Sequence, residues 1–97
     1  MNVALCRISL RVHGARSLKD KRKTARSIIA RVQNRFNVSV AEMDDNDLWQ
    51  RLTLGVSCVS NDSRHANEVV SKVVEYISAL RGETELLDYE LEILNAF

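Results

Sequence analysis

The sequence predicts an α+β fold whose elements follow one another in the order β-α-β-β-α-β. Four segments alternate between apolar and polar side chains, as half-buried strands do, and two segments repeat their apolar residues every three or four positions, as amphipathic helices do. The 97 residues contain no proline and three glycines, which leaves no linker or low-complexity segment between these elements. We therefore expect a single domain over residues 1–97, with enough hydrophobic residues (45%) for one core.

In the first half of the chain, two strands flank one helix. Strict alternation over residues 2–12 predicts the first strand. The apolar residues of 18–36 fall on one side of a helix, for which Ser17 is a suitable N-cap and Asp20 an approximate capping-box partner. Residues 37–43 are predicted to form a second, shorter strand.

The second half repeats the pattern after an acidic turn at residues 44–47. Residues 51–60 alternate again and predict the third strand. Residues 63–80 form an amphipathic helix that begins after the capping residue Asp62. The last strand covers residues 84–94, and its alternation places four side chains inward: Leu87, Tyr89, Leu91 and Ile93.

This order of elements predicts the split β-α-β, ferredoxin-like arrangement. Right-handed crossovers and a hairpin between the second and third strands give a four-stranded antiparallel sheet in the order 4-1-3-2, with both helices on one face. The last strand then lies beside the first. We expect Glu90 and Glu92 to lie near Arg7 and Arg11 on the open face of this sheet.

The open face of the sheet is predicted to be partly apolar. By alternation, six apolar side chains point away from the helices: Val3, Leu5, Met43, Val59, Leu86 and Leu94. A homodimer formed through this face, or through the edge of the second strand, explains them most simply. The residues expected at a partner interface are Leu5, Met43, Val59 and Trp49, the last being the sole tryptophan and more often a core or edge anchor than a binding platform.

The net charge of +1 conceals a strong asymmetry between the two parts of the chain. Residues 1–40 carry ten Lys and Arg and one acid, whereas residues 41–97 carry four Lys and Arg and twelve acids. Such a division either gives the folded protein a positive patch that attracts an anionic partner or is neutralised where acidic and basic strands pair.

The first helix is the candidate binding surface. Basic side chains at its N-terminus and along one side are suited to phosphate groups, because they add to the positive end of the helix dipole. The candidate nucleic-acid- or anion-binding residues are Arg16, Lys19, Lys21, Arg22, Lys23 and Arg26. A solvated helix face that binds nothing explains the same pattern. The central strands lack aromatic residues on their open face, so stacking of splayed RNA bases is not expected.

Catalysis receives little support from the residues. His13 and His65 stand apart from any cysteine or carboxylate at catalytic or metal-ligand spacing, so we expect no catalytic residues, no metal and no cofactor. The segment 11–16 faintly resembles the phosphate cradle of acylphosphatases, which makes acyl-phosphate hydrolysis the weak enzymatic alternative. Cys6 and Cys58 fall within apolar alternation and are predicted to be buried thiols. No segment is apolar enough to span or anchor in a membrane, and a cytoplasmic location is expected.

Several stretches together resemble the bacterial YlxP-like proteins, a family of unknown function. They are Gly14 to Arg22, Asn34 to Glu42, Asp47 to Arg51, Val59 to Asp62 and Leu86 to Glu90. The resemblance implies a ferredoxin-like fold. It also implies a ribosome- or RNA-associated role, because such genes often lie among those for translation initiation and ribosome maturation. It implies no catalytic residues.

Together these observations predict a small non-enzymatic protein that associates with ribosomal RNA or a ribosome-associated protein of the maturation machinery through its basic first helix. The alternative is a homodimeric module that binds a protein or a ligand through its open sheet face. Steep weakening of binding with rising salt is expected of the first and not of the second.

Overall fold

The computed structural model describes residues 1–43 and 48–97, and it has the predicted order of elements. The acidic turn expected at 44–47 lies outside the described residues. The elements are β1 (Asn2–Val12), α1 (Leu18–Arg35), β2 (Ser39–Met43), β3 (Arg51–Ser60), α2 (Ser63–Ala79) and β4 (Thr84–Asn95). The four strands form one antiparallel sheet in the order β2-β3-β1-β4, which confirms the predicted α+β, ferredoxin-like topology.

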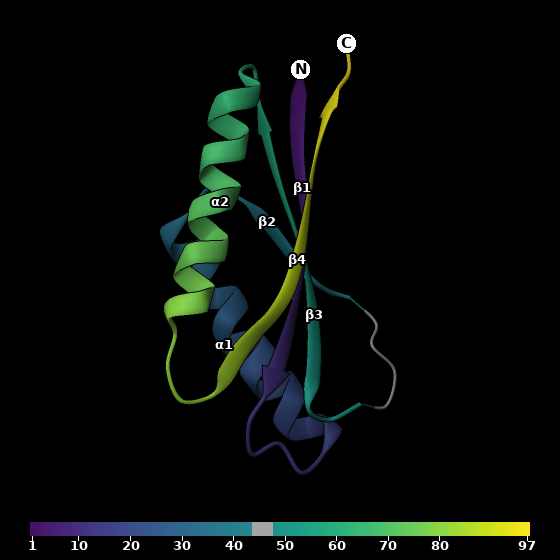
Figure 1. Ribbon diagram of the computed structural model, residues 1–97, viewed down its shortest axis with the longest axis vertical. Coiled ribbons are helices and arrows are strands. Elements are labelled where there is room, and N and C mark those ends of the chain that lie inside the picture. The colour runs from purple at the N-terminus through teal and green to yellow at the C-terminus, as the bar shows by residue number, and fades with distance from the viewer. Residues whose placement is uncertain (44–47) are drawn as a thin grey trace.

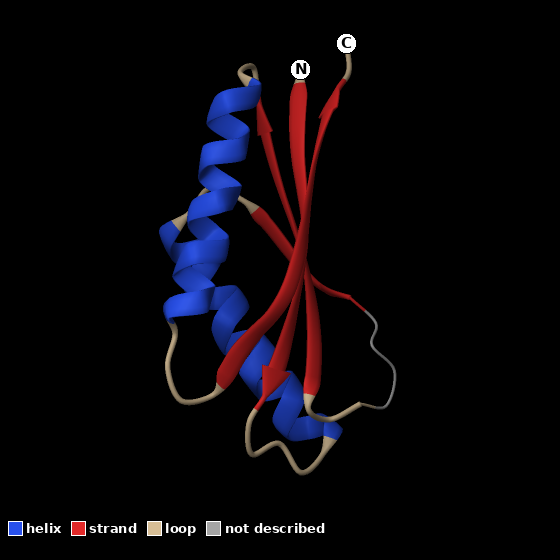
Figure 2. Cartoon of the chain, in the orientation of Figure 1, coloured by secondary structure: helices blue, strands red, loops and turns tan. Residues whose placement is uncertain are grey.

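Both helices cover the same face of the sheet and leave the other face open (Figures 1 and 2). α1 packs mainly over β2 and β3, and α2 packs over β1, β3 and β4. The core lies between these two layers, because every second side chain of β1 and β3 points toward the helices. Its largest fully buried side chains are Ile8, Leu10, Ile28, Leu52, Leu54 and Ile77.

Short polar side chains fix where the helices begin. The Ser17 hydroxyl accepts a hydrogen bond from the Asp20 backbone N–H at 3.1 Å, as expected of an N-cap. The Asp20 carboxylate accepts from the backbone N–H of Arg16 at 3.0 Å, whereas a capping box would use the N–H of the cap residue itself. At α2, the Asp62 carboxylate accepts from the Arg64 N–H at 3.0 Å.

The last strand departs from strict alternation at a β-bulge. Ser9 lies opposite Asp88 and Leu10 lies opposite Leu86, so Leu87 is an extra residue in β4. Leu86 therefore packs against the core and Leu87 is exposed. The expectation that Leu86 faces outward and Leu87 inward was wrong, because an inserted residue reverses the facing of every residue on one side of it.

Candidate functional site

Most basic residues of α1 and of the turn before it are exposed. The residues of this helix that are buried, among them Ala25, Ile28 and Val32, lie on the side that faces the sheet. Side chains three and four positions apart then share the outer side. We call the five exposed cations on that side and at the preceding turn the basic stripe: Arg16, Lys19, Arg22, Lys23 and Arg26.

No cation of the basic stripe forms an ion pair with an acid among residues 1–43 and 48–97. The ion pairs in that part of the chain join Arg7 to Glu90 and His13 to Glu85. Farther along α1, the Arg35 guanidinium lies over the ring of Tyr76 at 5.0 Å from its centroid. The stripe thus presents positive charge that the described fold does not neutralise.

Lys21 does not belong to this surface, although it was predicted to contact phosphate. Its side chain is 4% exposed, because it stands four residues before Ala25 and seven before Ile28 on the sheet-facing side of α1. The aliphatic stem of a lysine packs in such positions while its amine seeks the surface. The same spacing, read from the sequence, would have separated Lys21 from its neighbours.

We expect Lys21→Met to leave RNA binding unchanged and Arg22→Met to weaken it. Methionine keeps most of the apolar stem that packs on the sheet-facing side of α1 and removes only the charge, so the free energy of unfolding should change by less than about 1 kcal/mol. Salt titrations of RNA affinity, with thermal unfolding of both variants, measure the two effects. Equal loss of salt dependence in the two variants would mean that the Lys21 amine reaches phosphate after all.

The open face of the sheet carries an apolar cluster at one end. Val3 of β1 lies opposite both Val59 of β3 and Leu94 of β4, so these three side chains form one row across the face. Val59 is 63% exposed and Leu94 is 45% exposed. Leu5 follows on the same face of β1 and is 37% exposed.

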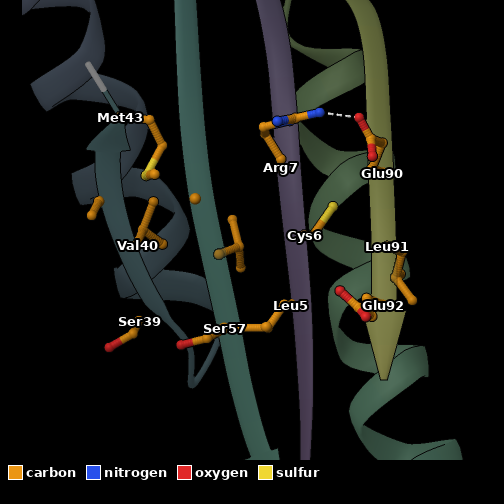
Figure 3. Close-up of a pocket in the computed structure, with 13 residues that line it drawn as sticks. Leu5, Cys6, Arg7, Ser39, Val40, Met43, Ser57, Glu90, Leu91 and Glu92 are labelled. Carbon is orange, nitrogen blue, oxygen red and sulfur yellow. Dashed lines mark hydrogen bonds and ion pairs between the residues drawn. The ribbon is translucent and has the colours of Figure 1, made fainter. Parts of the chain in front are cut away.

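Beside this cluster the open face is hollowed into a trough of about 700 Å³ (Figure 3). Small residues such as Ala41 and Gly55 lie along it, and the Met43 side chain lies over Gly55, where an added Cβ would come within 3.0 Å of the Met43 sulfur. Leu5 lines the same trough. Of the predicted interface residues, the structure thus brings Leu5, Met43 and Val59 to one face. Trp49, 44% exposed, precedes β3 near the opposite end of the sheet.

The predicted pairing of charges across β1 and β4 is confirmed in one case and wrong in the others. Arg7 lies opposite Glu90 and forms an ion pair with it (Figure 3). Glu92 lies opposite Leu5. Because β4 runs antiparallel to β1, residues later in β4 lie opposite residues earlier in β1. Arg11 lies instead opposite Glu85, beyond the bulge.

The groups considered for catalysis are dispersed. His13 follows β1, and its Nε2 lies 3.5 Å from an Oε of Glu85 with both side chains exposed. His65 lies in the first turn of α2, after the far end of β3, and so stands apart from His13. In the described part of the chain, no three His, Cys, Asp or Glu side chains lie close enough together to hold a metal ion.

Cys6 is buried beneath the sheet, and burial raises the pKa of its thiol to about 11. Because only the thiolate is a nucleophile, we expect Cys6 to react with iodoacetamide at pH 8 about a hundredfold more slowly than in the unfolded chain. Stability should also fall as pH rises from about 9 to about 11, since over this range the unfolded chain ionises first. Peptide mapping of the alkylated protein measures Cys6 separately from Cys58. Rapid labelling of Cys6 without unfolding would contradict the burial.

Comparison with known proteins adds a family to this geometry. A match to the family described as "Protein of unknown function (DUF503)" covers residues 3–91. The chain belongs to the DUF503 family. It is also 37% identical over 68 residues to the "Uncharacterized protein YlxP" of Bacillus subtilis (strain 168), an alignment that covers 70% of this chain and 74% of that protein. The resemblance to YlxP-like proteins is thereby confirmed. Because the family is one of unknown function, the function of this DUF503 protein has to be inferred from its own exposed surfaces.

Within residues 1–43 and 48–97 of this DUF503 protein, no helix is both long and apolar enough to cross a membrane.

Proposed function

We propose that the protein binds structured RNA through the phosphate backbone, using the basic stripe of α1, and that its target is ribosomal RNA or a particle that contains it. The observation that carries the proposal is the set of five exposed cations that no described acid neutralises. The rigid helix α1 holds four of these cations at fixed intervals, and Arg16 lies in the turn just before it. Cations on such a surface replace the counterions condensed on a nucleic acid, and the release of those counterions drives binding.

The open face of the sheet supports backbone binding over base recognition. RNA-recognition modules of the sheet type stack bases on aromatic side chains of the two central strands. In this chain those strands present Arg7, Ser9, Thr53, Gly55 and Ser57 toward the open face. Duplex or otherwise structured RNA, whose phosphates run along a groove, is therefore the form that suits the stripe.

A salt titration of affinity for a short RNA duplex tests this function. Five phosphate contacts predict that the logarithm of the association constant falls with the logarithm of salt concentration with a slope of about −4.5. Sedimentation of cell extract extends the test to the ribosome: the protein should travel with ribosomal particles at low salt and leave them at high salt. A slope near zero would overturn RNA binding, and a protein absent from the particles at both salt concentrations would overturn the ribosomal target.

A second function, assembly of two copies through the open sheet face, is favoured by the row of Val3, Val59 and Leu94 next to Leu5. Isolated exposed apolar side chains are common, but a contiguous cluster spanning three strands is typical of a contact surface. A second copy would cover it by a two-fold symmetric contact.

Leu5→Asp and Val59→Asp test the sheet-face assembly. Light scattering should give twice the monomer mass for the unmodified protein and the monomer mass for both variants, because each buries a carboxylate in the contact. Arg22→Ala serves as the control, since the basic stripe lies on the other side of the sheet. A monomeric unmodified protein at concentrations well above the micromolar range would remove this candidate.

A further inference from the structure

A hollow at one end of the open sheet face brings two arginines together. Arg11 near the end of β1 and Arg51 at the start of β3 are directly opposite partners in the sheet. Both are exposed and both line a hollow of about 430 Å³ together with His13, Gly14 and Gln50. This end of the sheet is also where β1 turns toward the first residues of α1 (Figure 1).

Two like charges at directly opposite sheet positions destabilise a fold unless something lies between them. Elsewhere on the same face the protein avoids this cost, since Arg7 lies opposite Gly55 on one side and forms an ion pair with Glu90 on the other. Arg11 and Arg51 form no ion pair with an acid in the described part of the chain. The nearest acid in the sheet is Glu85, which lies directly opposite Arg11 on β4 and forms its ion pair with His13, at 3.5 Å.

The turn beside the arginines leaves room for a ligand. Gly14 has a φ of +76°, and a Cβ placed there would meet no atom within 4 Å. Glycine is therefore required by the backbone conformation, and the space next to it is open. Guanidinium groups bind phosphate oxygens in a planar, two-pronged manner that a lysine cannot reproduce.

We propose that the hollow between Arg11 and Arg51 binds a phosphate group, whose negative charge lies between the two guanidinium groups. The phosphate comes either from the backbone of RNA already bound to the basic stripe or from a free phosphate compound. In the first case the inference rests on the function proposed above, and it extends the RNA path from the outer side of α1 around the β1–α1 turn to the sheet. The phosphate chemistry itself does not depend on that function.

The test uses inorganic phosphate as the probe, at constant ionic strength, with NMR signals of the hollow as the readout. Phosphate should shift the backbone amide signals of Gly14 and Arg51 in the unmodified protein and in Arg7→Gln, a control on the same face of the sheet and on the strand of Arg11. Arg51→Gln should abolish the saturable shift. Arg51→Gln should also melt at a higher temperature than the unmodified protein in chloride, because it removes the like-charged pair, and this shows that the variant is folded.

The inference is overturned if phosphate shifts no signal of the hollow, or if Arg51→Gln responds as the unmodified protein does. A second arm with duplex RNA distinguishes the sources. If RNA is one source, Arg11→Gln combined with Arg51→Gln lowers the magnitude of the salt slope by about two. If the double variant keeps the salt slope of the unmodified protein, and the unmodified protein does respond to inorganic phosphate, the hollow binds a free phosphate compound. A protein that binds phosphate but no RNA retains this inference and loses the proposed function.

Discussion

The triple variant Arg22→Ala, Lys23→Ala, Arg26→Ala should lose most of the RNA affinity of the protein. Removal of three of the five cations of the basic stripe is expected to reduce the magnitude of the salt slope by about three. At 0.1 M salt this corresponds to more than about a hundredfold weaker binding. The three positions are exposed on α1, so the fold should be retained. Fluorescence anisotropy with a labelled RNA duplex at several salt concentrations measures the affinity and the slope together.

A control with the same composition separates the surface from the total charge. Arg64, Lys72 and Arg81 are also two arginines and one lysine, are exposed, and lie on α2 and just beyond it. Replacing either set with alanine changes the net charge from +1 to −2. The control variant should bind RNA with a nearly unchanged salt slope. Long-range attraction of RNA depends on net charge, which the two variants share, whereas direct phosphate contacts depend on the positions of the cations. Equal losses in the two variants would show that no particular surface binds RNA.

Leu10→Ala should be far more destabilising than Leu5→Ala, although both leucines lie on β1. Leu10 is fully buried between sheet and helices, whereas Leu5 is 37% exposed on the open face. Truncation of a buried leucine removes apolar contact and leaves a cavity, which costs about 2–5 kcal/mol. At an exposed site the cost should stay below about 1 kcal/mol. Urea unfolding monitored by circular dichroism compares the two.

Comparison of Leu5→Ala with Leu10→Ala also tests assembly of two copies through the open sheet face. If two copies associate through Leu5, its truncation lowers stability in a manner that depends on protein concentration, whereas the effect of Leu10→Ala does not. A loss of several kcal/mol on Leu5→Ala that is independent of concentration would mean that the open face is covered from within the chain. That outcome would contradict the exposure of Leu5.

The order and facing of most elements could be read from the sequence because periodicity is a local property. Alternation over residues 2–12 and 51–60 matches β1 and β3 to the residue, since a strand with one buried face must repeat every two positions. α1 begins after its capping residue Ser17. The exposed stripe of α1 followed from the same reasoning, apart from Lys21, whose charge concealed its place on the buried face.

Other features were decided only when strands paired. The bulge in β4 inserts Leu87, so Leu86 faces the core instead of the open face. The position of this extra residue is set by pairing with β1, and the local apolar pattern does not reveal it. The opposition of Arg11 and Arg51 likewise depends on register between segments forty residues apart. The sequence by itself therefore determined the order of elements and the basic side of α1, whose causes lie within a few turns of chain. Tertiary structure decided which charges meet, because contact across a sheet depends on the alignment of distant strands.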